Sequence, residues 1–343
     1  MKKSSKRMLP ALLSLAMATT SLPMNVPGMP GGRDVSDGEG DTQMVSEKTL
    51  VYVSSYDGTE RSQDFNGNWK FFLGDAGNGQ EFSFDDSGWE SIQLPHDYSI
   101  EQGYSSNMEA ESGYLPGGVG WYRKHFTVPE SASDKQVRVD FDGVYMNATV
   151  YINGTKLGTH PYGYSPFSFD LTPYLKLGGE NVIAVKVNHQ TPSSRWYSGS
   201  GIYRDVKLTM TPVVHQALHG TRITAPKLEL EQSGDVSVCV ETEVQNGSSE
   251  EQDVEVSYSI YKKSDESKTP VGSGRAGAVK LAAGETQTVT AEMTVASPEL
   301  WNLGDPELYV VETTIDFGSA ANDVTESEFG FRYFEFNNKE GFF

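Results

Sequence analysis

Short runs of alternating hydrophobic and polar residues fill the chain from about residue 50, and they predict β-strands. In "VRVDF" the side chains of Val137, Val139 and Phe141 fall on one face, as expected for a half-buried strand. In "ATVYINGTKLG" the pair Asn153-Gly154 separates two such runs, which is a strong hairpin signal. "NVIAVKVNH" is almost continuously apolar at its start and predicts burial on both faces. No amphipathic helix of useful length is predicted between residues 50 and 215.

This pattern predicts an all-β chain of two sandwiches. Residues 47–214 contain many short strands with Gly and Pro turns, which favours a jelly-roll β-sandwich. In residues 215–328, "VSVCVETEV", "VEVSYSIY" and "TVTAEMTV" alternate with period two between polar turns, as is typical of an immunoglobulin-like β-sandwich. The second region has fewer Trp and Tyr residues, and we interpret it as a spacer.

The N-terminus has the layout of a secretory signal peptide over residues 1–18. An apolar run, "MLPALLSLAMA", follows four basic residues: Lys2, Lys3, Lys6 and Arg7. An Ala-x-Ala pattern ends at Ala18, where we expect cleavage, and the run is too short to span a bilayer. Residues 19–46 are rich in Pro, Gly, Ser, Asp and Met and predict a disordered linker. The protein is thus expected to be secreted or periplasmic, the alternative being a disordered basic tail.

The net charge limits the kinds of partner this chain can bind, and its cysteine content limits the covalent links it can form. The 343 residues include 27 Lys and Arg against 47 Asp and Glu, a formal net charge of −20. This balance argues against nucleic acid and membrane as partners, since both require clustered basic residues. The only cysteine, Cys239, excludes an internal disulfide, and its apolar neighbours predict a small buried filler. No phosphate loop, dinucleotide fingerprint or metal-ligand spacing is found.

Two groups of polar residues suggest catalysis at first sight. His96 and Asp97 are neighbours, but adjacent residues of an extended segment point in opposite directions, so we expect them to brace loop backbone. Glu101, Glu109 and Glu111 flank the stretch "GYSSNMEAESGY". Paired carboxylates can hydrolyse a glycosidic bond, but a mobile loop is a poor platform for them. Solvated charge is therefore the favoured interpretation of the three glutamates.

Aromatic residues gather in the loops of the first region, as in "GWYRKHF" and "PYGYSPFSFDLTPYL". Such loops suit a carbohydrate surface, although each ring taken singly is better explained by the core. The stretch "RWYSGSGIYRDV", residues 195–206, combines aromatic and basic residues with a Gly- and Ser-rich centre that predicts flexibility. It either presents the carboxylate of Asp205 to a partner or ties it down through Arg195 or Arg204.

The order of these motifs resembles glycoside hydrolase family 2. "FNGNWKFFLGD", "WESIQLPHDYSI", "GVGWYRKHFTVP", "FDGVYMNATVYINGTKLGTHPYGYSPFSFDLTPYL", "NVIAVKVNH" and "RWYSGSGIYRDVKL" are similar to its N-terminal, galactose-binding-like domain. "SPELWNLGDPELYVVETTI" is similar to the end of its immunoglobulin-like domain. "FGFRYFEFNNKEGFF", which includes residues 329–343, is similar to the lead-in to its (β/α)₈ catalytic barrel. The "GYSPFSFDLTPYL" version is most similar to β-galactosidases, and β-glucuronidase and β-mannosidase stay as alternatives.

The resemblance implies a substrate-binding role for Asp205. In the family the matching loop reaches over the mouth of the barrel, and its aspartate contacts hydroxyls of the sugar. We expect Arg204 to fix the Asp205 rotamer, with Arg195 and Trp196 as supporting residues. Gly199 and Gly201 would then allow close approach to another domain.

The resemblance also implies what this chain does not supply. The family's acid/base and nucleophile glutamates lie on the barrel, so no catalytic residue is expected in this chain, and alone it should be inactive. No cofactor or metal is expected here, and a divalent or monovalent cation in the barrel is left open. Expected partners are a carbohydrate substrate and the chain's own barrel, with a homo-oligomer left open. The alternative is a free carbohydrate-binding or adhesion module without enzymatic activity.

Overall fold

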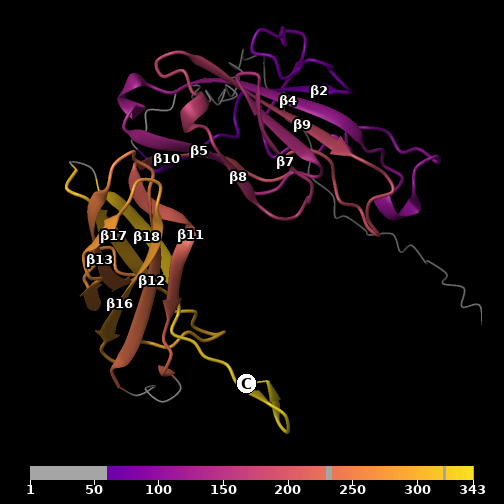
Figure 1. The fold of residues 1–343 in the computed structure, drawn as a ribbon. Helices are drawn as coiled ribbons and strands as arrows, with labels where there is room; N and C mark the ends of the chain where they lie inside the picture. The colour runs from indigo at the N-terminus through magenta and orange to yellow at the C-terminus, as the bar shows by residue number, and fades with distance from the viewer. Residues whose placement is uncertain (1–59, 229–233, 320–321, 343) are drawn as a thin grey trace, which may run out of the picture. The chain divides into compact units, whose positions relative to one another are not determined.

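The computed structural model describes residues 60–228, 234–319 and 322–342, and their regular secondary structure is mainly β-strand. The predicted signal peptide, residues 1–18, and linker, residues 19–46, lie outside the described residues. Within the described ranges, no helix has both the length and the apolar character needed to cross a membrane. The prediction of an all-β chain with two sandwiches is confirmed (Figure 1).

The first sandwich is made of two antiparallel sheets. Its six-stranded sheet has the order β3 (Glu90–Ile92), β2 (Trp69–Leu73), β4 (Gly118–Thr127), β9 (Glu180–His189), β6 (Ala148–Ile152) and β7 (Thr155–His160). Its four-stranded sheet has the order β1 (Ser62–Asp64), β10 (Val206–Pro212), β5 (Lys135–Phe141) and β8 (Phe167–Asp170). Short 3₁₀ turns are η1 (Ala110–Ser112), η2 (Glu130–Ala132) and η3 (Thr172–Tyr174).

One apolar core lies between these two sheets. The predicted face of β5, Val137, Val139 and Phe141, is buried in it together with residues of β6 and β9. Strand β9 is buried almost continuously from Asn181 to Val187, as its apolar run predicted. The hairpin between β6 and β7 is confirmed too, because Asn153 and Gly154 take the positive φ angles of 50° and 87° that such a turn requires.

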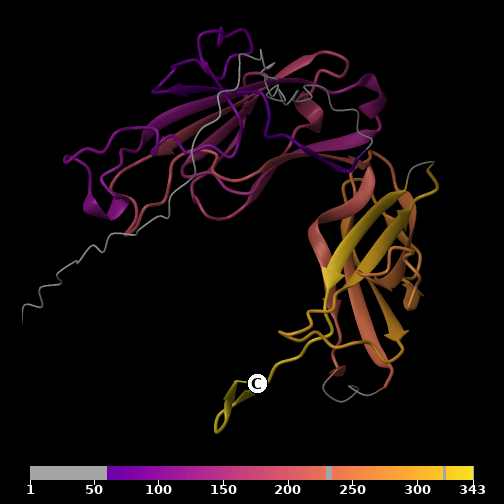
Figure 2. The same cartoon turned by 180° about the vertical axis from the view of Figure 1, so that it is seen from behind.

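The second sandwich repeats this plan with fewer aromatic residues. One sheet has the order β11 (Val214–Thr224), β12 (Val236–Asn246) and β16 (Thr286–Val295). The other has the order β14 (Gly272–Arg275), β13 (Gln252–Lys262), β17 (Tyr309–Asp316) and β18 (Asp323–Phe329), with β15 (Val279–Leu281) paired to β13. The C-terminal strands β19 (Phe336–Asn337) and β20 (Gly341–Phe342) form a hairpin, the last yellow segment in Figure 2.

The period-two alternation along the strands determines which residues form the core of the second sandwich. It also explains why one prediction was wrong. On β12 the side chains of Val236, Val238 and Val240 are fully buried in the core. Cys239 falls on the opposite face of the strand and is only half-buried. The prediction of a buried filler was therefore wrong, because the alternation that buries its neighbours turns Cys239 away from the core.

Candidate functional site

The loop between β9 and β10 carries the "RWYSGSGIYRDV" motif, and its centre is rigidly held. Ser200 and Ile202 have no exposed surface. The backbone carbonyls of Ile202 and Ser200 accept hydrogen bonds from the amides of His96 at 2.8 Å and Tyr98 at 2.9 Å. The predicted flexibility of this Gly- and Ser-rich centre was therefore wrong, because a second segment of the chain pairs with it.

Asp97 fastens this loop from the neighbouring segment. Its Oδ1 accepts the backbone amides of Ser99 at 3.0 Å and Ser200 at 2.8 Å, and its Oδ2 accepts the Tyr197 hydroxyl at 2.5 Å. Its neighbour His96 contacts the Tyr122 hydroxyl instead, at 2.8 Å. The predicted structural role of the His96-Asp97 pair is confirmed.

Gly199 and Gly201 are needed for contacts inside this sandwich. A Cβ atom on Gly199 would lie 2.9 Å from Oδ2 of Asp97, and one on Gly201 would lie 2.2 Å from the Tyr122 hydroxyl. The close approach in this structure is to the sandwich's own residues, and the expected approach to another domain stays a prediction. Their positive φ angles, 76° and 120°, also favour glycine.

A buried histidine supports the loop from β9. His189 is 4% exposed; its Nδ1 is 2.5 Å from Ser200 Oγ, and its Nε2 is 2.9 Å from Ser193 Oγ. Burial lowers the pKa of His189, so the ring stays neutral around neutral pH. A neutral ring both donates and accepts a hydrogen bond, which matches its two serine partners.

Asp205 stands at the end of this loop and is exposed. Its Oδ1 accepts a hydrogen bond from Asn66 Nδ2 at 3.0 Å. Asn66 is itself fixed, because its Oδ1 accepts the Val206 amide at 2.8 Å. Within the described part of the chain, Oδ2 of Asp205 has no hydrogen-bond partner and is free to accept one from a ligand.

The arginines expected to hold Asp205 lie elsewhere. Arg204 donates to the Tyr164 carbonyl at 3.5 Å and lies over the Tyr203 ring, 5.1 Å from its centroid. Arg195 is exposed, and among the described residues no hydrogen bond or ion pair reaches its side chain. The expectation that Arg204 fixes the Asp205 rotamer was wrong, and Asn66 does this instead. Asn66 is 139 positions away in sequence, so no local pattern could have indicated it.

Asp205 borders an open hollow of about 310 Å³. The hollow is lined by Ser62, Gln63, Asp64, Asn66, Asp205 and Lys207. Its lining is polar and presents carboxylate, amide and ammonium groups, which are the groups that hydrogen-bond sugar hydroxyls. Trp196 does not line this hollow; it lies at a second, aromatic hollow together with Arg195.

The three glutamates near the η1 turn do not form a site. Glu101 is exposed and lies 3.1 Å from Nε2 of His96, and Glu111 is exposed. Glu109 is half-buried, and its Oε1 is covered without a hydrogen-bond partner in the described residues. Solvation is thus confirmed for Glu101 and Glu111 and wrong for Glu109.

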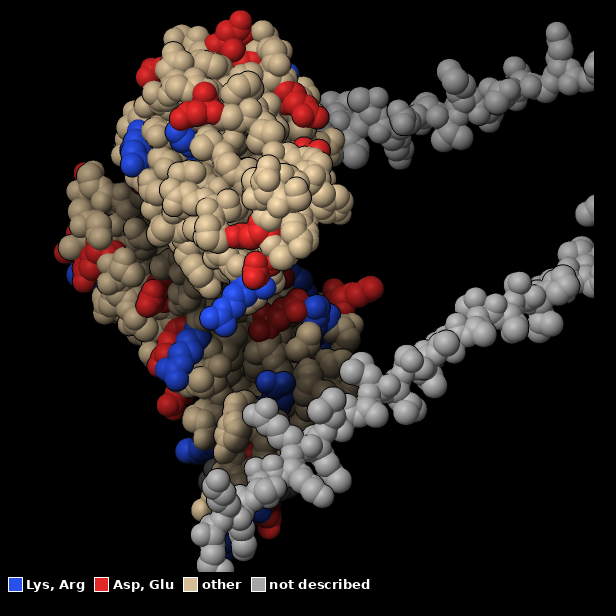
Figure 3. Space-filling model, turned by 90° about the vertical axis from the view of Figure 1, so that its right-hand side faces the viewer, with Lys and Arg blue, Asp and Glu red and all other residues tan. Residues whose placement is uncertain are grey.

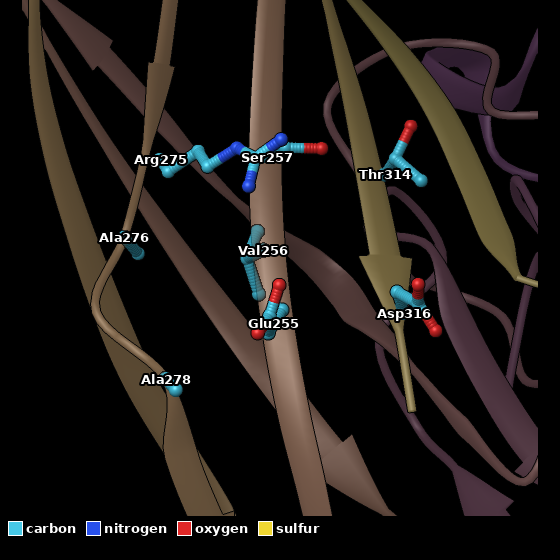
Figure 4. Close-up of a pocket in the computed structure, with 8 residues that line it drawn as sticks. All are labelled: Glu255, Val256, Ser257, Arg275, Ala276, Ala278, Thr314 and Asp316. Carbon is cyan, nitrogen blue, oxygen red and sulfur yellow. The ribbon is translucent and has the colours of Figure 1, made fainter. Parts of the chain in front are cut away.

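The second sandwich has two neighbouring open hollows, of about 250 Å³ and about 520 Å³, and both are lined in part by Glu255, Ala278 and Asp316. The smaller of the two is a polar groove. Figure 4 shows the Arg275 side chain extending from β14 towards Ser257 on β13, with Glu255 and Asp316 nearby. Arg275, Glu255 and Asp316 are all exposed, so the groove is a crease in the solvent face of a sheet.

Surface charge and candidate metal ligands add no further site. On the face drawn in Figure 3, acidic and basic side chains are interspersed, and uncharged residues cover most of the surface. Among residues 60–228, 234–319 and 322–342, no three His, Cys, Asp or Glu side chains are grouped as a metal site would require.

Two family models match the chain and together cover both sandwiches. Residues 62–212 match the sugar binding domain of glycosyl hydrolases family 2, and residues 221–332 match a second domain of the same family. The chain therefore belongs to glycosyl hydrolases family 2.

Relatives and solved structures agree with this membership. The chain is 40% identical over 286 residues to beta-galactosidase BoGH2A of Bacteroides ovatus, covering 82% of this chain and 33% of that protein. It is 36% identical over 283 residues to a putative beta-glucuronidase of Formosa agariphila, covering 81% and 26%. A family 2 structure from Bacteroides cellulosilyticus superposes with a TM-score of 0.77 at 34% identity, covering 82% and 37%. The chain thus spans between about a quarter and a third of the length of these two relatives.

Proposed function

We propose that this chain forms the N-terminal part of a secreted retaining β-glycosidase, of the β-galactosidase kind, that removes terminal β-linked sugars. Its relatives include both a beta-galactosidase and a putative beta-glucuronidase, and the higher identity to the former supports the narrower choice. In this proposal the acid/base and nucleophile glutamates lie outside the chain, and the second sandwich is a spacer.

One observation carries the proposal for this chain's own role. Asp205 has one carboxylate oxygen held by Asn66 and the other free, at the edge of a polar hollow in the domain matched as sugar binding. A carboxylate oriented in this way can accept a hydroxyl hydrogen bond without losing rotamer entropy on binding. We infer that Asp205 accepts hydroxyls of the sugar in the cleavage subsite.

The test is Asp205→Asn in a protein that joins this chain to the remaining length of its relatives. The amide keeps the Asn66 contact but loses charge and acceptor capacity. A hydrogen bond to a charged group is worth about 1.5–3 kcal/mol, so kcat/KM on an aryl β-galactoside should fall roughly ten- to a hundredfold. The melting temperature should change little.

Asp134→Asn is the matched control, because Asp134 is an exposed aspartate of the same sandwich outside the hollow. It should leave both kinetics and melting temperature unchanged. If Asp205→Asn lowers the melting temperature while kcat/KM per folded molecule stays normal, Asp205 is only a brace of its loop.

A further inference from the structure

Four asparagines of the chain are followed by glycine, and such pairs can modify themselves chemically. The four are Asn66, Asn78, Asn153 and Asn246. In such a pair the backbone nitrogen of the second residue can attack the side-chain carbonyl carbon of the asparagine. Glycine hinders this attack least, because it has no Cβ atom and the widest choice of backbone angles. The attack also requires the asparagine side chain to turn, so it depends on how firmly the fold holds each one.

Three of the four side chains are held at both of their polar atoms. Asn66 makes the two hydrogen bonds described above. Asn153 accepts the Val182 amide and donates to the Tyr174 carbonyl, both at 2.9 Å. Asn246 is fully buried, and its Nδ2 donates to three backbone carbonyls at 2.8–3.1 Å. Each of these hydrogen bonds has to break before the side chain can turn to the following nitrogen.

Asn78 differs from the other three. It is exposed, in the segment between β2 and β3, where its backbone amide donates to the Ala76 carbonyl at 2.7 Å. In the described part of the chain, no hydrogen bond engages its side chain or the backbone nitrogen of Gly79. Both reacting groups are therefore unengaged at this pair.

We propose that Asn78 is a site of spontaneous deamidation in the folded chain. The Gly79 nitrogen loses its proton to a base in solution and bonds to Cγ of Asn78. The bond from Cγ to Nδ2 breaks, and the nitrogen takes up a proton and leaves as ammonia, which gives a five-membered succinimide. Water then opens the ring to aspartate or to isoaspartate, so one water is consumed for each ammonia released. None of the residues of the proposed function takes part.

The isoaspartate product should disturb the packing behind this segment. The Gly79 carbonyl accepts a hydrogen bond from Nη1 of Arg123 at 2.6 Å, and Arg123 is fully buried. A Cβ atom on Gly79 would lie 3.1 Å from the Trp121 ring, so there is little free space beside it. Isoaspartate adds a methylene group to the main chain directly before Gly79 and moves its carbonyl. Aspartate leaves the main chain as it was.

The experiment incubates the purified chain at mildly alkaline pH and physiological temperature, and then digests it with trypsin and a glutamate-specific protease. Residues 71–81 form a peptide in which Asn78 is the only asparagine. Mass spectrometry follows the mass gain from amide to acid, with an unincubated sample digested in parallel. We expect Asn78 to convert at least about tenfold faster than Asn66, Asn153 or Asn246, because those three must first lose hydrogen bonds. A rate at Asn78 no higher than theirs overturns the proposal.

Incubation in urea is the control for the role of the fold. Once the chain is unfolded, the four pairs should convert at similar rates. Asn78 should also react faster in urea than in the folded chain, because Gly79 is buried there. If the tenfold preference for Asn78 persists in urea, the local sequence selects it and the fold does not, which overturns the proposal.

Two variants test the consequence for stability. Asn78→Gln would have to form a six-membered ring, so the conversion at this position should be suppressed and incubation should leave the melting temperature unchanged. Asn78→Asp, measured fresh, carries the new charge on an ordinary main chain and should melt like the parent chain. The incubated parent chain should melt lower by roughly 2–4 °C. An unchanged melting temperature after full conversion to isoaspartate would refute the effect on the packing around Arg123.

Discussion

Lys124 is a charged residue buried in an apolar core, and its titration should be visible in the stability of the protein. Its side chain is fully buried on β4, its Nζ lies 4.5 Å from the Phe65 ring centroid, and it donates to the Gly67 carbonyl. Burial lowers the pKa of Lys124 from 10.5 to about 8. Gly67 directly follows Asn66, so this lysine also supports the turn that holds Asp205.

We expect the free energy of unfolding of the unmodified protein to rise with pH above pH 8, and we expect Lys124→Met to abolish this rise. Between pH 8 and 10.5 the native lysine has lost its proton while the unfolded one keeps it. The unfolded state then binds more protons, so the free energy of unfolding increases with pH, by roughly 1–2 kcal/mol between pH 8 and 9.5. Urea titrations of both proteins at these two pH values measure the difference. Equal slopes for the two proteins would show that Lys124 titrates normally.

The tryptophans should fall into three classes when each is changed to Ala. Trp69 and Trp121 are buried, with 0% and 1% exposure, so each change should cost about 3–5 kcal/mol. Trp301 is half-buried against Gly330 and should cost about 1–2 kcal/mol. Trp196 is mostly exposed and should cost less than about 1 kcal/mol. Chemical denaturation gives the order, and a Trp196 cost equal to that of Trp69 would refute this placement of the cores.

At the scale of elements, the loop of residues 195–206 depends on tight packing at Gly201. A Cβ atom there would lie 2.2 Å from the Tyr122 hydroxyl and 2.8 Å from the His96 carbonyl oxygen. Gly118 is a matched control, because its φ of 112° is close to the 120° of Gly201, but a Cβ atom on it would meet nothing within 4 Å. Comparing Ala at the two positions therefore separates crowding from backbone strain.

We expect Gly118→Ala to cost about 1 kcal/mol through strain alone. Gly201→Ala should cost about 1–3 kcal/mol more, because either Tyr122 or the loop must move. In the longer enzyme it should also lower kcat/KM, since Asp205 follows four residues later. Equal losses of stability at the two positions would mean that the loop is not packed as described.

The elements differ in how well their sequence predicts them. The face of β5 and the Asn153-Gly154 hairpin follow from local rules, because alternation and turn chemistry act between near neighbours. The burial of Ser200 does not, since it depends on pairing with residues 96–98 about a hundred positions earlier. Judged from the sequence alone, Gly and Ser at the centre of a loop indicate flexibility. In this structure the same residues allow close packing instead. The Asn66 contact was missed for the same reason.

At the scale of the whole molecule, the proposed function places the catalytic glutamates outside this chain. It therefore predicts that the chain hydrolyses nothing by itself. A retaining mechanism needs two carboxyl groups about 5–5.5 Å apart on either side of the scissile bond. The nearest candidates in the first sandwich are Glu109, half-buried with one oxygen covered, and Glu111, exposed on the η1 turn. These two occupy different environments and line none of the hollows described above.

We therefore expect no turnover of chromogenic β-galactosides by the purified 343-residue chain, while a protein that adds the remaining two thirds of its relatives' length is active. Assays of both at equal concentration, with release of the chromophore as the measurement, test this directly. Glu109→Gln and Glu111→Gln in the longer protein should retain its rate, because neither residue takes part in the chemistry. Robust turnover by the shorter chain that disappears in either variant would place the catalytic carboxylates in the first sandwich and overturn the proposed function.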